Sequence, residues 1–196
     1  MLPIYIMLYL IVVIVFMFDL YLVIKFTEYV YCGAIRHQPP LVSSPKKLRK
    51  QVIREITLNY PHAKNICELG SGFGGLARMI ARKTNANVYA LENMPFAVFI
   101  SKACDFLSQN KNNKTIYCDA FGWLENTSTH FDIAIAYLGP NVTPKIKKYH
   151  KKIDVLISLD FEIPELAPKR IINLKHGYTK YKKIKYPHRI FVYEFK

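Results

Sequence analysis

The first 24 residues form an apolar run that contains a single charged residue. Residues 2–18 carry no charge, and after Asp19 the apolar pattern resumes until Lys25. A helix of this length spans about 34 Å at 1.5 Å per residue, which is enough to cross a bilayer. No basic segment precedes the run and no small-residue cleavage site follows it, so a cleaved signal peptide is not expected. The pattern predicts a membrane anchor over residues 1–24.

Behind this run the pattern first breaks and then becomes helical. Residues 25–43 have the character of a connector, because two adjacent prolines interrupt any helix. Ser44 and Pro45 then suit an N-cap and a first helical position, and apolar residues recur at four-residue spacing as far as about Tyr60. The expected domain organisation is an anchor over 1–24, a basic linker and N-terminal helix over 25–60, and one globular domain over 61–196.

Beyond residue 60, short β-rich runs alternate with helical stretches. The strand-like runs are apolar for nearly their whole length, which is typical of a parallel sheet buried on both faces. Two further strand-like runs follow with no helix between them, which favours an antiparallel edge. The pattern predicts an α/β fold, a doubly wound, Rossmann-like sheet with an antiparallel last strand. The expected strands are 65–69, 88–92, 115–118, 131–138, 153–161, 170–174 and 189–195, and the expected helices are 74–83, 95–109 and 143–150.

The net charge of +14 is unevenly distributed along the chain. The contributions are −1 from residues 1–24, +5 from 25–60, +1 from 61–140 and +9 from 141–196. Because basic residues directly follow the apolar run, the positive-inside rule places the rest of this single-pass protein on the cytoplasmic or matrix-equivalent side. The basic flank and tail suit an anionic lipid surface. We do not expect nucleic acid as a partner, because the anchor restricts access and no N-P-P-[YF] motif follows the fourth strand.

One glycine-rich turn carries the candidate chemistry. The first strand ends at Glu68-Leu69, and glycines follow at positions 70, 72, 74 and 75. Glycines allow a tight turn and close approach of a ligand, and the following helix start offers free N–H groups to an anionic group. Glu92 ends the second strand and Asp119 follows the third. Because parallel strands end at one edge of a sheet, we expect an adenosine ligand, with Glu92 on the ribose hydroxyls and Asp119 on the adenine amino group.

Two cofactor classes fit this turn. Gly70, Gly72 and Gly75 match G-x-G-x-x-G, the dinucleotide pattern. Glu68 and glycines 70, 72 and 74 match E-x-G-x-G-x-G, which resembles motif I of the class I S-adenosylmethionine-dependent methyltransferases. We favour the second class, because an acid before the first glycine suits the ammonium of a methionine moiety and has no purpose beside a pyrophosphate. The resemblance implies S-adenosyl-L-methionine as the cofactor and the following binding residues: Glu68, Gly70, Ser71, Gly72, Gly74, Glu92, Asn93, Asp119 and Ala120.

Further motifs narrow this resemblance over about residues 40–168. They are S-S-P-x-x-L from Ser43, E-L-G-S-G-F-G-G from Glu68, Glu92-Asn93-x-Pro95, Tyr-Leu-Gly-Pro at 137–140 and Phe-Glu-Ile-Pro at 161–164. Together with the apolar run, they resemble the membrane-anchored protein-lysine N-methyltransferases that act on the ATP synthase c subunit and the adenine nucleotide translocase, and their bacterial relatives. The resemblance implies methyl transfer to a lysine side chain of a membrane-associated protein.

Methylation of a lysine needs an amine that has lost its proton, so the site has to orient the amine and provide a path for the proton. Tyr137 and Asn141 follow the fourth strand, where this fold presents the acceptor, and they are the candidate catalytic residues. Tyr137 would orient the amine through its hydroxyl and Asn141 through its amide oxygen. Both also fit ordinary strand-end and helix-cap positions. Asp132 is expected to cap a strand, and the scattered cysteines and histidines give no support for a metal site.

Three other functions stay open. Among methyltransferases, a lipid, a quinone or another small-molecule acceptor is as compatible as a lysine. A membrane-tethered NAD(P)-binding oxidoreductase would use the dinucleotide pattern with a Tyr-x-x-x-Lys pair, Tyr178 with Lys182 or Tyr181 with Lys185, although we attribute these pairs to the composition of a Lys-rich tail. The third is a tethered adenosine-binding protein without enzymatic activity.

Overall fold

The computed structural model describes residues 2–30, 42–109, 111–174 and 188–195. The chain divides into two units, Met1–Val42 and Ser43–Lys196, which are considered separately. The tyrosine-lysine pairs considered for an oxidoreductase lie outside the described residues.

The first unit contains one helix, α1 (Leu2–Val30). It continues six residues beyond the predicted anchor. Its segment Tyr5–Ile24 is exposed along its length, and it is long and apolar enough to cross a bilayer. Membrane anchors and signal sequences share this property.

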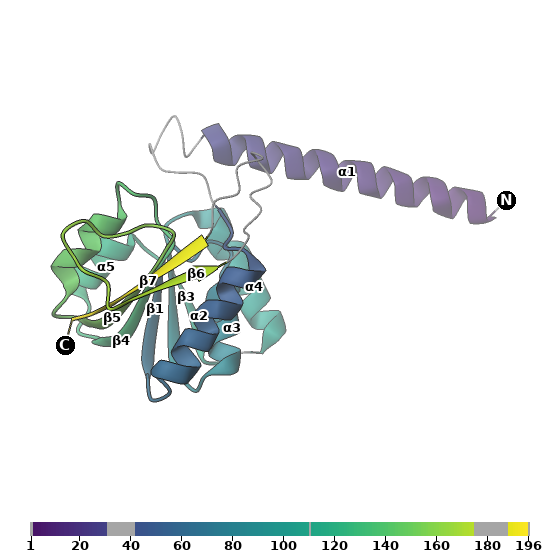
Figure 1. The fold of residues 1–196 in the computed structure, drawn as a ribbon. Helices are drawn as coiled ribbons and strands as arrows, with labels where there is room; N and C mark the ends of the chain where they lie inside the picture. Colours follow the sequence, from purple (N-terminus) through teal and green to yellow (C-terminus); the bar gives the residue numbers. More distant parts are fainter. Residues whose placement is uncertain (1, 31–41, 110, 175–187, 196) are drawn as a thin grey trace. The chain divides into compact units, whose positions relative to one another are not determined.

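The second unit is built on a seven-stranded sheet with the order β3-β2-β1-β4-β5-β7-β6 (Figure 1). Neighbouring strands run parallel from β3 to β5, and β7 is antiparallel to both β5 and β6. The α/β class and the antiparallel strand predicted from the sequence are therefore confirmed. The strands are β1 (Asn65–Leu69), β2 (Asn87–Glu92), β3 (Asn113–Tyr117), β4 (Phe131–Ala136), β5 (Ile153–Leu159), β6 (Arg170–Leu174) and β7 (His188–Glu194).

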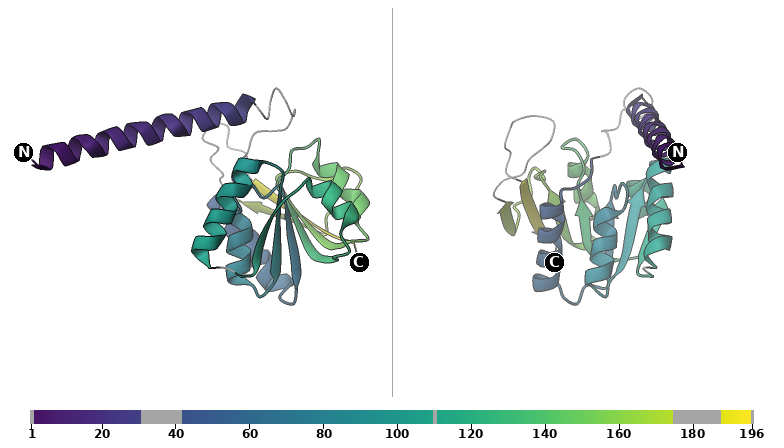
Figure 2. Two further views of the ribbon diagram at one scale, coloured as in Figure 1. Left: turned by 180° about the vertical axis from the view of Figure 1, so that it is seen from behind. Right: turned by 90° about the vertical axis from the view of Figure 1, so that its right-hand side faces the viewer.

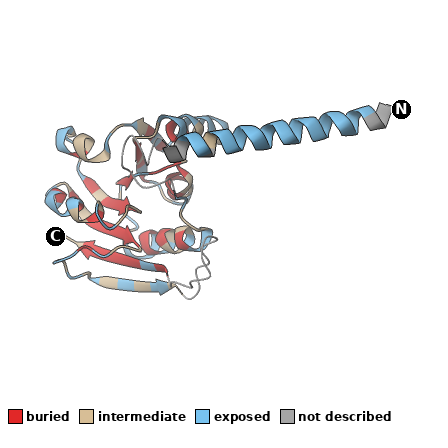
Figure 3. Cartoon of the chain, turned by 90° about the horizontal axis from the view of Figure 1, so that it is seen from above, coloured by how far each residue is buried: buried red, intermediate tan, exposed pale blue. Residues whose placement is uncertain are grey.

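Helices cover both faces of this sheet (Figure 2). One cluster of buried hydrophobic side chains packs α2 and α3 against one face of the sheet. A second cluster packs α5 and η2 against the other face. α4 lies on the α3 side, because Ser101 of α4 hydrogen-bonds Thr115 of β3, whose strand partner Ala90 belongs to the first cluster. The central strands are accordingly buried on both sides (Figure 3). The helices are α2 (Lys46–Asn59), α3 (Gly75–Lys83), α4 (Pro95–Ser108), α5 (Ala120–Asn126) and the 3-10 helix η2 (Thr143–Tyr149).

Several local expectations differ from the structure. Ser44 does not cap α2; Pro45 occupies the N-cap without a side-chain bond, and the Ser44 hydroxyl instead accepts from Arg49 at 3.0 Å. The segment predicted as a helix from residue 143 is a 3-10 helix, and the short helix α5 was not predicted. Asp132 does cap a strand, because its Oδ2 accepts from the backbone nitrogens of Lys64 and Asn65 at 2.8 and 2.7 Å.

A partly buried ion pair connects α2 to the far edge of the sheet. The Arg170 guanidinium donates to Glu55 Oε1 at 2.6 and 3.1 Å and to the Tyr60 hydroxyl at 2.7 Å. The Tyr60 hydroxyl in turn donates to Glu194 of β7 at 2.7 Å. Glu55 is only 5% exposed, so its charge depends on Arg170 for compensation. The helix that precedes the glycine-rich turn is thereby held to the last two strands.

Candidate active site

The glycine-rich turn connects β1 to α3 at the carboxyl edge of the sheet. Gly70, Gly72 and Gly74 have φ angles of +71°, +55° and +67°, which side chains other than glycine rarely adopt. A Cβ on Gly74 would lie 2.2 Å from Ser101 Oγ, so the turn is also packed against α4. The backbone nitrogens of Gly70 and Ser71 both donate to the carbonyl oxygen of Leu91 at 2.9 Å, which fixes the turn to the end of β2.

Glu68 lies beneath this turn and is 5% exposed. Its Oε2 accepts from the backbone nitrogen of Ala77, in the first turn of α3, at 2.9 Å. Burial raises the pKa of this carboxyl to about 8, although the Ala77 hydrogen bond and the charge of Arg49 act in the opposite direction. Its expected position near a methionine ammonium stays a prediction; the structure shows a buried acid whose charge a cation would stabilise.

Glu92, at the end of β2, is already engaged with the backbone. Its Oε2 accepts from Gly72 N at 2.7 Å, and its Oε1 accepts from Asn93 N and Met94 N at 2.9 Å each. The role of Glu92 in binding the ribose hydroxyls stays a prediction. The structure adds that the turn brings its own N–H group within reach of the carboxylate. A carboxylate has about four lone-pair sites, so Oε2 keeps capacity for one further donor.

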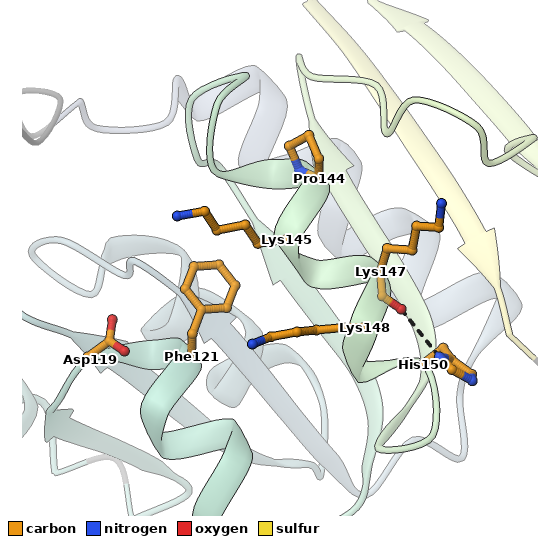
Figure 4. Close-up of a pocket in the computed structure, with 7 residues that line it drawn as sticks. All are labelled: Asp119, Phe121, Pro144, Lys145, Lys147, Lys148 and His150. Carbon is orange, nitrogen blue, oxygen red and sulfur yellow. Dashed lines mark hydrogen bonds between the residues drawn. The ribbon is translucent and has the colours of Figure 1, made fainter.

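Asp119 follows β3 and caps α5, because its Oδ2 accepts from Gly122 N at 2.7 Å. Its side chain is exposed, and Ala120 is the first residue of the helix. Asp119 lines a cavity of about 710 Å³ whose walls come from α5 and η2. In Figure 4, Lys145 and Lys148 extend from η2 toward the side of Asp119 and Phe121. The remaining lining residues are Pro144, Lys147 and His150.

The lysines around this cavity are largely compensated. Lys147 pairs with Glu165 at 2.5 Å, and Lys148 pairs with Glu125 at 2.6 Å. Lys145 is exposed on the same helix. The cavity therefore offers Asp119 as an acceptor and an aromatic wall, and its net positive charge is small.

The turn contains a buried polar atom that has no hydrogen-bond partner among the described residues. The hydroxyl oxygen of Ser71 is buried and makes no hydrogen bond with any described residue. Such an atom costs about 1–3 kcal/mol unless a ligand or water satisfies it. Asn93 is half-buried beside Glu92. The turn thus brings a buried hydroxyl and left-handed glycine backbone to the edge where Glu92 and Asp119 also lie.

Tyr137 follows β4 at the same edge and belongs to a polar cluster that the sequence did not reveal. Its hydroxyl donates to Asp160 Oδ2 at 3.1 Å, and the same oxygen lies 2.7 Å from His188 Nδ1. Burial, and then the charge of Asp160, raise the pKa of Tyr137. Asn141 is exposed, and no hydrogen bond joins it to Tyr137 among the described residues. The catalytic roles of Tyr137 and Asn141 stay predictions.

The sequence held one usable signal for this cluster. Asp160 interrupts an apolar run at the position where β5 ends, as Glu68 and Asp119 do near the ends of their strands. The expected strand 153–161 extended past Asp160 and so concealed it. Among the described residues, no three His, Cys, Asp or Glu side chains are grouped to hold a metal ion.

No protein-family profile and no curated protein sequence matches this chain. Solved structures do match. An RNA methyltransferase from Salinibacter ruber, in complex with S-adenosyl-L-homocysteine, superposes with a TM-score of 0.64 at 19% identity over 79% of this chain and 94% of that chain. TrmK from M. capricolum, in complex with S-adenosyl-homocysteine, superposes with a TM-score of 0.61 at 14% identity over 79% and 69%.

A putative RNA methyltransferase from Pyrococcus horikoshii superposes with a TM-score of 0.61 at 16% identity, over 77% of this chain and 85% of that chain. At identities below 20%, these similarities bear on architecture alone. The chain therefore has the Rossmann-like methyltransferase fold.

Proposed function

We propose that this protein is an S-adenosylmethionine-dependent methyltransferase. The observation that carries the proposal is the carboxyl edge of β1, β2 and β3, where a turn with three left-handed glycines meets Glu92 and Asp119. A sheet of this order places an adenosine-containing ligand at that edge. The structural neighbours that contain S-adenosylhomocysteine support the same cofactor for this chain.

The residues present fit this cofactor. The buried hydroxyl of Ser71 has no hydrogen-bond partner among the described residues, so a ligand donor or acceptor could satisfy it. Glu68 offers a carboxyl whose ionised form a ligand ammonium would favour. When bound, the cofactor supplies an electrophilic methyl group on a sulfonium. The residues that would hold it are Glu68, Gly70, Ser71, Gly72, Gly74, Glu92, Asn93, Asp119 and Ala120.

The acceptor in this proposal is a lysine side chain of a membrane-associated protein. The resemblance of the motifs around Glu68, Tyr137 and Phe161 to membrane-anchored lysine methyltransferases supports a lysine. The apolar helix α1 supports a membrane location with the second unit on the cytoplasmic or matrix-equivalent side. The positive charge supports contact with anionic lipid: residues 1–42 contain two basic and two acidic residues, so the second unit holds the whole net charge of +14.

Titration calorimetry on the full chain in detergent tests the cofactor. We expect S-adenosylmethionine and S-adenosylhomocysteine to bind, and NAD and NADP not to bind. Binding of NAD without S-adenosylhomocysteine would replace this proposal with a membrane-tethered oxidoreductase. Binding of neither would indicate a protein without this enzymatic function.

Labelled S-adenosylmethionine identifies the acceptor. Membranes from cells lacking the protein are incubated with and without the purified full chain, and the label is followed into protein, lipid and RNA. Label in a membrane protein, recovered as methyl-lysine after hydrolysis, is the expected result. Label in lipid or in RNA alone would overturn the lysine acceptor while keeping the methyltransferase.

A further inference from the structure

We propose that His188 accepts the proton of the acceptor amine and that Asp160 and Tyr137 are positioning residues for it. The inference rests on the proposed methyltransferase function and assigns a proton acceptor within it. It starts from a buried histidine nitrogen at the carboxyl edge of the sheet that has no hydrogen-bond partner among the described residues.

The topology brings these three residues to the candidate site. Asp160 follows β5, and His188 begins β7, which pairs with β5 in the antiparallel direction. Asp160 N donates to Arg189 O at 2.8 Å, and Arg189 N donates to Asp160 Oδ1 at 3.0 Å. Because β7 runs opposite to β5, its first residue lies at the edge where β5 ends. His188 is therefore fixed by strand pairing at the carboxyl edge of the sheet.

Tyr137 connects this cluster to the glycine-rich turn. It follows β4, which lies between β1 and β5 in the sheet. Its neighbour Leu138 packs against the turn, since a Cβ on Gly70 would lie 2.7 Å from Leu138 Cδ2. A row of neighbouring residues therefore runs without a break from the turn through Leu138 and Tyr137 to Asp160. In this fold the cofactor would bind at one end of the row, and His188 lies at the other.

The hydrogen-bond network determines the tautomer of His188. Asp160 Oδ2 lies 2.7 Å from Nδ1 and also accepts from the Tyr137 hydroxyl. An ionised carboxylate only accepts, so Nδ1 must carry the hydrogen. In the neutral ring, Nε2 then has the lone pair. This is the arrangement in which a carboxylate orients an imidazole to act as a base through its other nitrogen.

Two features show that the arrangement of His188 and Asp160 costs free energy of folding. His188 Nε2 is buried without a hydrogen-bond partner among the described residues, and the side chain is 7% exposed. Asp160 has a φ of +64°, in the left-handed region. Strained non-glycine residues cluster at functional sites, and a buried polar atom without a partner calls for an explanation such as a catalytic role. A donor from the acceptor molecule would satisfy Nε2.

The other groups of the cluster do not compete for this role. Burial and Asp160 raise the pKa of Tyr137, so its phenol stays protonated and serves as a donor to Asp160. Arg189 on β7 is exposed, and its guanidinium lies over the Phe191 ring at 5.1 Å. From β6, the residue opposite His188 is the uncharged Leu174. Among the described residues, the charged and titratable groups that hydrogen bonds join to the imidazole are accordingly Asp160 and, through it, Tyr137.

The step conserves atoms and charge. One N–H bond of the protonated acceptor amine breaks, and Nε2 takes the proton to give an imidazolium paired with the Asp160 carboxylate. The freed lone pair of the amine forms the N–C bond to the methyl group, and the C–S bond breaks with its electron pair remaining on sulfur. The imidazolium then returns its proton to water.

The test compares His188→Gln, His188→Ala and Asp160→Asn with His62→Gln, which alters an exposed histidine outside the cluster. The rate of label transfer from saturating S-adenosylmethionine into membranes is measured against pH. We expect His188→Gln to lower the rate about 100-fold or more while the Kd for S-adenosylhomocysteine changes less than twofold. The acidic limb of the wild-type pH profile should disappear in this variant, and added imidazole should restore part of the rate to His188→Ala.

A second measurement does not depend on activity. Nitrogen NMR of the histidine-labelled full chain, assigned with His188→Gln, reports which ring nitrogen carries the hydrogen. We expect a neutral Nδ1–H ring in the wild type and a changed tautomer balance in Asp160→Asn. An Nε2–H ring, or a His188→Gln rate equal to that of the wild type, would overturn the proposal. A wild type that neither binds S-adenosylhomocysteine nor transfers label would instead overturn the proposed function.

Discussion

The backbone nitrogen of Gly72 donates to Oε2 of Glu92 at 2.7 Å, and both groups are buried. The carboxylate that ends β2 is therefore bound to the turn that ends β1. This bond organises the turn, and any ribose hydroxyl that binds Glu92 has to share the carboxylate with Gly72.

Replacing Glu92 with glutamine tests this bond. The amide cannot accept from Gly72, Asn93 and Met94 with the strength of a carboxylate, and bonds to a charged acceptor are worth about 1.5–3 kcal/mol. We expect the affinity for S-adenosylhomocysteine to fall at least tenfold, as measured by calorimetry. Hydrogen exchange at residues 70–74 should become faster. Faster hydrogen exchange with unchanged affinity for S-adenosylhomocysteine would show that Glu92 stabilises the turn and does not contribute to binding.

Gly74→Ala should disrupt the turn by a different mechanism. The alanine would keep a φ near +67° and would place its Cβ 2.2 Å from Ser101 Oγ, in the fully buried contact between α3 and α4. Backbone strain of this kind costs about 1–3 kcal/mol. We expect that loss in the free energy of unfolding measured with urea, together with weaker S-adenosylhomocysteine binding.

Gly139→Ala is the matched control for this change. A Cβ at Gly139 meets no atom within 4 Å. The control should keep both stability and affinity. Equal losses in the two variants would mean that the left-handed turn is not what the cofactor requires.

The Glu68 carboxyl predicts a pH dependence of stability. Burial raises its pKa from an ordinary value of 4.5 to about 8, so the folded state binds this proton more tightly than the unfolded state. Its contribution to stability is fully present below about pH 4.5 and is lost as the pH rises through about 8. Between these values, wild-type stability should fall more steeply than that of Glu68→Gln, in unfolding curves taken at each pH. Glu162→Gln, which changes an exposed carboxyl, should follow the wild type.

Arg170→Met should weaken the connection between α2 and the last strands. It leaves Glu55 buried with an uncompensated charge, although the Arg170 side chain is 34% exposed and water can enter. We expect a loss of about 2–3 kcal/mol in urea unfolding. The double variant with Glu55→Gln should recover part of this loss, because no buried charge remains. An additive double variant would show that the two side chains do not interact.

The fold was accessible from the sequence because each central strand is an apolar run followed by a polar strand end. The parallel sheet, its antiparallel last strand and the edge at which Glu92 and Asp119 lie follow from that pattern. The hydrophobic pattern was too weak to predict α5, because this seven-residue helix has one buried residue, Leu124. The Asp119 side chain that caps it was recognised only as a possible adenine acceptor.

The Asp160–His188 contact could not be predicted from local pattern. The two residues are 28 positions apart, and they meet only because β7 inserts between β5 and β6. Similarly, the strand end at Glu92 indicated a free carboxylate, whereas the backbone donors around it depend on the conformation of the turn. Sequence periodicity determines which face is buried, and it contains no information on which donor reaches a carboxylate first.

The position of β7 between β5 and β6 also constrains the order in which the strands can join the sheet. β7 pairs with β5 on one side and β6 on the other, so β6 has no partner strand among the described residues until residues 188–194 have left the ribosome. The sheet therefore cannot close before these residues have been synthesised. A chain that lacks residues 188–194 should have an open edge beside β5 and no imidazole beside Asp160.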